Sequence, residues 1–236
     1  MNNCIRLTLA LAILCPALST AMLASDNSYL YLLQGIPGRD YSASADPALP
    51  VDVLINGDLC YQRGLTYGTI AGPLTLIPGT YEVQVSVADS LLPCSNSPFI
   101  DSTVSLEAGK NVSAVVALSQ TGSPTLLTFT NNFSPVTATM GRVLFAQAAD
   151  APALEVILQS KTTMKVYTYT ANPGRLLDVN LPADTYSIAI NQGTTALVAS
   201  TSVDLYSQSV LLLYTVGQAS NQSVDLEYKS VRNVIH

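Results

Sequence analysis

The sequence predicts an all-β protein made of two tandem antiparallel β-sandwich domains that follow a signal peptide. Apolar and polar residues alternate in many short segments, as they do in strands with one buried face. Turn signals such as Asn56-Gly57 and Pro173-Gly174 separate these segments at short intervals. The same series of segments occurs in both halves of the chain. No segment after the N-terminus keeps a helical apolar stripe over three turns, so sandwiches built of sheets are expected.

The N-terminus has the order of a secretory signal peptide. Arg6 precedes an apolar run over residues 7–15, and small residues follow. Cleavage fits after Ala21, with Ala24 as the alternative, and we assign residues 1–24 to the signal. The apolar run is shorter than the roughly 20 residues that span a bilayer. We therefore expect a secreted, periplasmic or cell-surface protein with no transmembrane segment in its mature chain.

The repeat defines the expected domains, which are residues 27–133 and 141–236, with residues 134–140 as the linker. Alternating segments align between the halves, and each half has a proline-led turn followed by a Thr-Tyr pair or an Asp-Thr-Tyr run. The aligned segments are LPVDVLING (49–57) with APALEVILQS (151–160), and LTLIPGTYEVQV (74–85) with LDVNLPADTYSIAI (177–190).

The alternation also predicts which way individual side chains face. Tyr81 and Tyr186 fall on inward positions of aligned strands, where a tyrosine is usually part of the core. Asp52 and Glu155 fall on outward positions, so both carboxylates are expected in solvent.

Two of the four cysteines, Cys60 and Cys94, remain after removal of the signal. An even pair in an exported protein predicts a disulfide. Closing a loop of this length stabilises the fold by about 3–4 kcal/mol in the chain-entropy model. Two separate buried thiols are the alternative.

Composition excludes several classes of function. The formal net charge is −6 and the ten basic residues are scattered, with only Lys161 and Lys165 close together. Nucleic acid needs clustered cations, so it is rejected as a partner. The single histidine, His236, ends the chain, which leaves no imidazole for a nucleophilic triad or a zinc site. No phosphate-binding glycine loop is present, so we assign no catalytic residue, cofactor or metal.

Carboxylates are the remaining groups with catalytic potential. A glycosidase needs two acids about 5–10 Å apart, whereas most acids here fall in turns or on outward strand positions. An extracellular carboxylate-based hydrolase is therefore the alternative to a protein that is not an enzyme. Calcium is the most plausible ion, with Asp40 and Asp46 as ligands, but the dense acidic pattern of a calcium loop is missing. A structural subunit that assembles through edge strands is a further alternative.

One loop, GIPGRDYSASADPALP, is longer in the first repeat than in the second. Binding residues often lie in such loops. Arg39, Asp40, Tyr41 and Asp46 are therefore candidate contact residues for an extracellular protein or polysaccharide. A tolerated insertion is the alternative explanation of the loop.

The order of the segments GIP, PVDVLING, LTLIPGTYEVQV and VSLEAGKNVSAVVAL resembles the exported bacterial family called domain of unknown function 4397. The resemblance implies tandem Ig-like or transthyretin-like sandwiches with no established activity. Some relatives carry His before Gly-Ile-Pro, and this chain has Gln34 there, so no role of that histidine applies. Together these features predict a non-catalytic exported scaffold or binding protein.

Overall fold

The computed structural model describes residues 27–232, so the predicted signal peptide and His236 lie outside the described residues. Sixteen strands form four four-stranded sheets, and one short helix, α1 (Gly38–Tyr41), follows the first strand. The prediction of an all-β sandwich protein is confirmed.

The two halves of the described chain have the same topology. In the first half, outer sheet 1 has the order β3-β2-β5-β6 and inner sheet 1 the order β4-β1-β7-β8. In the second half, inner sheet 2 has the order β12-β9-β15-β16 and outer sheet 2 the order β11-β10-β13-β14. The strands of the first half are β1 (Ser28–Gln34), β2 (Val51–Ile55), β3 (Leu59–Leu65), β4 (Ile70–Leu76), β5 (Gly79–Val87), β6 (Ile100–Leu106), β7 (Asn111–Leu118) and β8 (Pro124–Asn131). Those of the second half are β9 (Met140–Gln147), β10 (Leu154–Ser160), β11 (Val166–Ala171), β12 (Leu176–Pro182), β13 (Asp184–Gln192), β14 (Thr195–Leu205), β15 (Val210–Val216) and β16 (Asp225–Val231).

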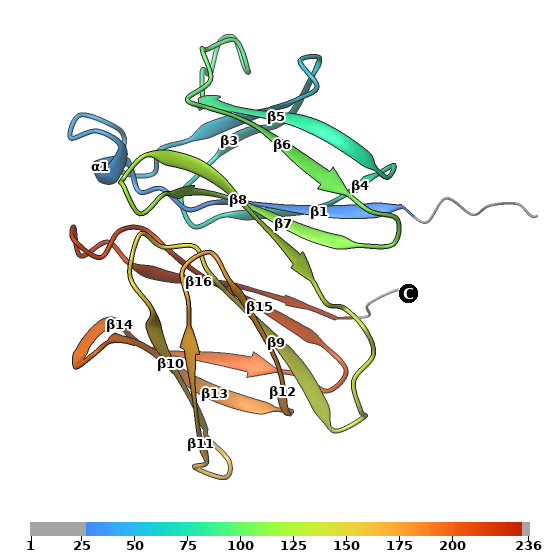
Figure 1. The fold of residues 1–236 in the computed structure, drawn as a ribbon, viewed down its shortest axis with the longest axis vertical. Coiled ribbons are helices and arrows are strands. Elements are labelled where there is room, and N and C mark those ends of the chain that lie inside the picture. The colour runs from blue at the N-terminus through green and yellow to red at the C-terminus, as the bar shows by residue number, and fades with distance from the viewer. Residues whose placement is uncertain (1–26, 233–236) are drawn as a thin grey trace, which may run out of the picture.

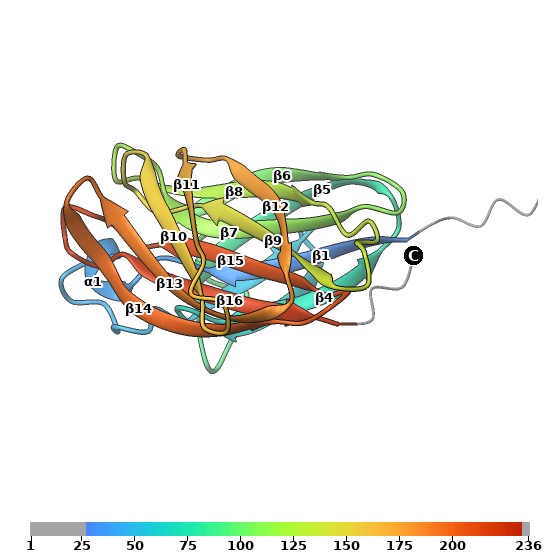
Figure 2. The same cartoon turned by 90° about the horizontal axis from the view of Figure 1, so that it is seen from below.

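The sheets stack as four layers along the long axis of the molecule (Figure 1). Outer sheet 1 is followed by inner sheet 1, inner sheet 2 and outer sheet 2. Figures 1 and 2 both show α1 at one end of the layers and the two ends of the described chain at the other. The loops near α1 therefore point away from both chain ends.

Each inner sheet contains one parallel strand pair that the sequence analysis did not predict. β1 pairs with β7 and β9 pairs with β15 in parallel, and the other neighbours are antiparallel. Alternation identifies the buried face of a strand but not its neighbour. In each repeat, five intervening strands supply the return connection that a parallel pair requires.

Two cores lie inside the sandwiches and follow the predicted alternation. Tyr186 is buried in the second core and Tyr81 is half-buried against the first, as the sequence predicts. Each hydroxyl donates to the carbonyl four residues earlier, at 2.6 Å for Tyr81 and 2.8 Å for Tyr186. This bond explains the Thr-Tyr turn in both repeats, because it pins the turn before the strand.

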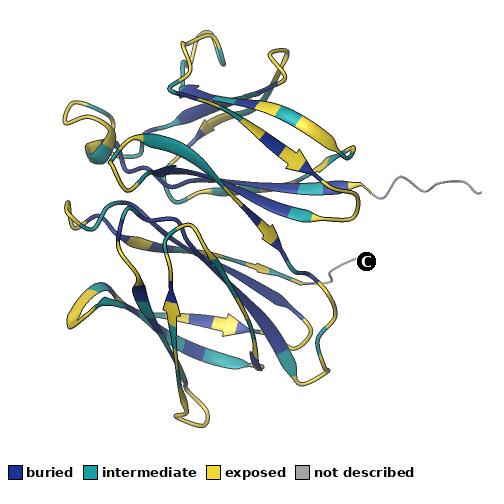
Figure 3. Cartoon of the chain, viewed as in Figure 1, coloured by how far each residue is buried: buried dark blue, intermediate teal, exposed yellow. Residues whose placement is uncertain are grey.

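A third core fills the space between the two inner sheets. Strands β7 and β15 are buried along almost their whole length (Figure 3), because both of their faces are covered. The hydroxyl of Tyr214 lies 2.6 Å from the hydroxyl of Ser113 across the interface, and the Asn131 side-chain amide donates to Ser113 at 2.7 Å. The buried residues of this core are Tyr31, Leu33, Val115, Ala117, Phe129, Phe133, Leu144, Ala146, Ala148, Val210, Leu212, Tyr214 and Val216.

Glycine allows the two repeats to touch through their backbones. The amide of Gly217 donates to the carbonyl of Gly35 at 3.1 Å. A Cβ at residue 35 would lie 2.7 Å from the Val216 side chain and 2.8 Å from the Val116 carbonyl oxygen. Since atoms do not approach so closely, a side chain at residue 35 would push the inner sheets apart.

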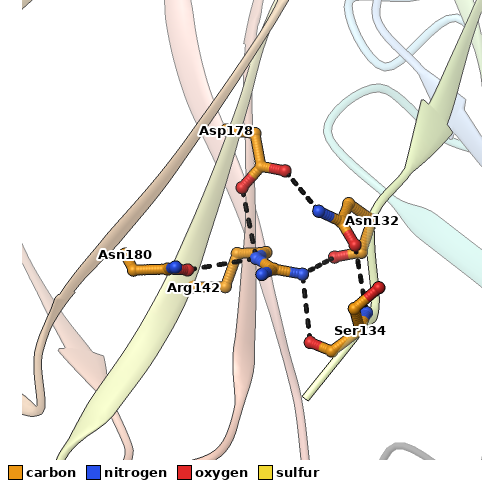
Figure 4. A network of polar contacts seen from close by, with 5 residues as sticks. All are labelled: Asn132, Ser134, Arg142, Asp178 and Asn180. Atoms are coloured by element: carbon orange, nitrogen blue, oxygen red, sulfur yellow. Dashed lines mark hydrogen bonds and ion pairs between the residues drawn. The ribbon is translucent and has the colours of Figure 1, made fainter. Parts of the chain in front are cut away.

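The connection between β8 and β9 is tied to inner sheet 2 (Figure 4). The buried Arg142 guanidinium donates to the carbonyls of Asn132 and Ser134 at 3.1 and 3.0 Å. It also pairs with Asp178 at 3.2 Å, and the Asn132 side chain donates to the same carboxylate at 2.7 Å. These bonds fix the path of the chain between the repeats.

The Cys60–Cys94 disulfide is confirmed, with Cα atoms 5.8 Å apart. It holds the β5–β6 loop over the outward face of outer sheet 1. Under this loop Asp52 accepts the amides of Gly64 at 2.9 Å and of Cys94 at 2.8 Å. Asp52 is only 1% exposed, so its predicted place in solvent was wrong. The strand pattern gives the direction of a side chain, but it does not show which loop covers that side chain.

We predict that Gly35→Ala lowers the free energy of unfolding by about 1–3 kcal/mol, the usual cost of overpacking. Gly79→Ala is the matched control, because a Cβ there would meet only the Tyr81 ring at an ordinary 3.8 Å. Urea denaturation of both variants measures the difference. Equal stability of the two variants would show that the repeats do not depend on this close contact.

Asp52→Asn should cost about 1–3 kcal/mol, since an amide nitrogen would face a buried backbone donor. Glu155 is the equivalent residue in the second repeat, and it is half-exposed with one long contact of 3.4 Å from Asn191. We expect Glu155→Gln to change stability by less than about 0.5 kcal/mol. Thermal unfolding at constant pH compares the two, and an equal effect would argue against a structural role of the Asp52 carboxylate.

Candidate functional site

A groove lies where the loop end of the first repeat meets the second repeat. Its volume is about 690 Å³, and we call it the junction groove. One wall comes from α1 and its flanking residues and from the β3–β4 turn, and the other comes from β14, the β15–β16 loop and the start of β16. The lining residues are Pro37, Arg39, Pro47, Tyr67, Leu197, Val198, Ala199, Thr201, Gln222, Ser223, Val224 and Asp225.

The long loop of the first repeat is closed at its base by backbone contacts. The Gly38 amide donates to the Pro47 carbonyl at 3.0 Å. A Cβ on Gly38 would overlap the Asp46 carbonyl oxygen, at 1.7 Å, so only glycine fits this closure. The Asp46 carboxylate accepts the amide of Ala48 at 2.8 Å within the same loop. The loop is therefore an ordered part of the groove wall.

Two of the four predicted contact residues join the repeats. Arg39 donates from its guanidinium to the carbonyl of Gln222 at 3.2 Å and lines the groove. Asp40 accepts from the Asn221 amide at 2.9 Å and from the hydroxyl of Ser223. The loop thus holds the second repeat through its polar side chains.

The other two predicted residues point elsewhere. Tyr41 packs on Phe99, with ring centroids 5.0 Å apart, and Asp46 serves the loop itself. Among the described residues, no group of three or more His, Cys, Asp or Glu side chains is arranged to hold a metal ion. Asp40 and Asp46, the acids considered for calcium, have separate partners.

Gln34 ends β1, directly before the Gly-Ile-Pro segment. It is fully buried, donates to the Leu49 carbonyl at 2.9 Å and accepts the amide of Ile36 at 3.0 Å. In the second repeat Gln147 donates to the Ala151 carbonyl at 3.2 Å. Both glutamines hold the chain as it leaves the first strand of their repeat, which is a structural role.

Sequence reasoning did not identify Tyr67, Asp225 and Glu227 as parts of a site. The Tyr67 hydroxyl lies 3.5 Å from the Ser223 carbonyl, across the repeat junction. Burial raises the pKa of Tyr67, and the neighbouring carboxylates of Asp225 and Glu227 raise it further. These residues come from segments far apart in the chain, so only the packing of the repeats reveals the cluster.

Glu227 packs against the turn between β3 and β4. A Cβ on Gly68 would lie 2.5 Å from its carboxylate oxygen. Burial raises the pKa of Glu227 to about 7, and the nearby Asp225 raises it as well. Lys229, on the same strand, donates to the carbonyl of Gly72 at 2.7 Å. Ionised Glu227 therefore places a poorly compensated charge at the repeat interface.

Half of the chain, residues 39–157, matches the domain of unknown function DUF4397. The match begins in α1, crosses from the first repeat into the second and ends in β10. No curated protein is detectably similar to the chain. Among the described residues, no helix is long and apolar enough to cross a membrane.

Several solved structures are weakly similar to the chain. A leucine-rich repeat protein from Bacteroides thetaiotaomicron is 15% identical, with 82% of this chain and 26% of that protein covered and a TM-score of 0.26. The chain thus spans about a quarter of that protein. A candidate cell adhesion protein from Bacteroides ovatus is 9% identical, with coverage of 90% and 99% and a TM-score of 0.29. Another from Bacteroides uniformis is 10% identical, with coverage of 87% and 98% and a TM-score of 0.27.

We predict that the free energy of unfolding falls as pH rises from 4.5 to 7. The raised pKa means that the folded state binds more protons than the unfolded state in this window, so the stabilising contribution of Glu227 is fully present below about pH 4.5 and is lost as pH rises through 7. The loss should be on the order of 1–2 kcal/mol, which allows for solvent screening. Measurement requires urea denaturation at several pH values.

Glu227→Gln should flatten the pH profile in this window. Glu107→Gln is the control, because Glu107 is an exposed glutamate of the first repeat. A profile that stays unchanged in Glu227→Gln would refute the role assigned to this carboxylate.

Proposed function

The chain belongs to the DUF4397 family, whose description gives no activity, and from the geometry of this member we propose a non-catalytic exported scaffold that binds an extracellular protein or polysaccharide. The observation that carries the proposal is the junction groove. It is built from both repeats and lies at the loop end, which points away from both ends of the described chain. A groove in this position stays accessible to a partner when either end of the described chain is held at a surface.

The acids near the groove support binding rather than hydrolysis. Asp40 is held by Asn221 and Ser223, while the Asp225 carboxylate accepts the amide of Leu226 at 2.8 Å. Glu227 packs on Gly68. A glycosidase would need two of these carboxylates facing each other across a substrate, and their contacts direct them to separate partners.

The disulfide supports export of the protein. Disulfides persist in oxidising compartments such as the periplasm and the cell exterior. Here the bond fixes a loop that shields Asp52. Charged residues make up only 11% of the chain, so neutral polar side chains supply most of the solvated surface.

A groove-filling variant tests the proposal. Ala199 is exposed and lines the groove, and Ala196 is exposed on the same strand outside it. Purified protein should bind saturably to washed cells of the source organism that lack the gene. Ala199→Trp should weaken this binding at least about ten-fold, whereas Ala196→Trp should leave it unchanged, because a central bulky residue blocks a binding site.

The proposal has two contradicting outcomes. Equal binding of the two tryptophan variants would remove the groove as the binding site. Turnover of any polysaccharide in a panel, abolished by a single Asp→Asn change, would show that the protein is an enzyme.

A further inference from the structure

Two differences between the repeats lie at the junction groove. The long loop closed by Gly38 lies between β1 and β2, whereas only residues 148–153 connect β9 and β10 in the second repeat. In outer sheet 1, β6 pairs regularly with β5 from Gly79↔Leu106 to Val85↔Ile100. Its counterpart β14 has two bulges, which lie between residues 196 and 201.

The bulged part of β14 is the part that lines the groove. Ile188 pairs with Thr201 and Ile190 pairs with Val198. Between these two pairs β14 therefore has one residue more than β13. Leu197, Val198 and Ala199 then form one wall. Bulges redirect side chains and interrupt the pairing edge. A partner would therefore contact the side chains of this wall, because its interrupted backbone edge is poorly suited to pairing with an added strand.

The groove combines an apolar wall with an acidic end. Pro47, Tyr67 and Leu197 supply apolar surface of the kind that covers the methylene stem of a long cationic side chain. The charged neighbours of Tyr67 are three carboxylates, those of Asp225, Glu227 and Asp40, and one guanidinium, that of Arg39. The local charge is therefore net negative when all four groups are ionised.

Two cations lie near the groove, and each donates to a neutral backbone carbonyl. Arg39 donates to the Gln222 carbonyl at 3.2 Å on the wall. Lys229 donates to the Gly72 carbonyl and lies over the Tyr31 ring, with 5.7 Å from its nitrogen to the ring centroid. Asp225 is exposed at the groove, and its carboxylate accepts the adjacent amide of Leu226 at 2.8 Å. Among the described residues Asp225 forms no salt bridge, so its carboxylate is available to an incoming cation.

We infer that the junction groove receives a lysine or arginine side chain of a partner polypeptide, with its stem along Tyr67 and Pro47 and its charged head at Asp225. This inference rests on the proposed function and names the partner's chemistry. Charge complementarity is the reason for the choice, because an acidic segment would be repelled by the carboxylates and a neutral glycan would gain hydrogen bonds from them but no ion pair.

The test uses the full mature chain labelled with nitrogen-15 and three blocked tripeptides at pH 8 and low salt. The tripeptides are Ala-Lys-Ala, Ala-norleucine-Ala and Ala-Glu-Ala, each acetylated and amidated. Ala-Lys-Ala should shift the backbone amide signals of Tyr67, Ala199 and Val224 saturably. Asp225→Asn should weaken its binding about five-fold, or about 1 kcal/mol, as expected for an exposed ion pair. Asp101→Asn, an exposed acid on β6, should not change the affinity.

Two results would overturn the inference. If the norleucine peptide binds as tightly as the lysine peptide, the groove selects apolar side chains. If Ala-Lys-Ala gives no saturable shift up to about 50 mM, an affinity too weak to be specific, a cationic side chain is excluded. In either case, binding to cells that remains sensitive to Ala199→Trp would leave the proposed function intact. Loss of that sensitivity would refute the proposed function instead.

Discussion

The packing of the two inner sheets against each other is the constraint on which the rest of the structure depends. It turns two sandwiches into four layers, and it buries the central strands on both faces. Gly35 makes the contact close enough for a backbone hydrogen bond to Gly217. At the opposite end of the interface, Arg142 binds the chain segment that connects the repeats. The relative position of the repeats is thus set by a core and by polar contacts at both ends of that core.

A fixed position of the repeats is what creates the junction groove. Its walls come from different repeats, so any rotation between them would change its width. The polar contacts of Arg39 and Asp40 with the β15–β16 loop stabilise the same geometry. Two differences between the repeats also lie at the groove, a longer loop in the first and a bulged edge strand in the second. These differences shape the surface that we propose for binding.

The sequence was sufficient for the fold class, the repeat and the disulfide, because alternation and cysteine count depend on local pattern. The sequence was insufficient to predict the exposure of a side chain where a separate loop covers the strand. Asp52 points outward as the pattern predicts, but the disulfide-bonded loop buries it. The nearly unbroken apolar runs of β7 and β15 were a usable signal for strands covered on both faces. The contact of Arg39 with the second repeat, and the roles of Tyr67 and Asp225, follow only from the packing of the repeats.

Because the inner sheets bind the repeats together, the two repeats should unfold as one cooperative unit, and this can be measured by following unfolding separately in each repeat. The chain has no tryptophan, so a single introduced tryptophan reports on its own repeat. Tyr61 packs against the first core and Tyr169 against the second, and each can be replaced by tryptophan in a separate variant. Equilibrium urea unfolding should give the same midpoint and slope for both probes, once each is referred to a global signal. Two distinct midpoints, with one repeat still folded while the other has unfolded, would contradict the account.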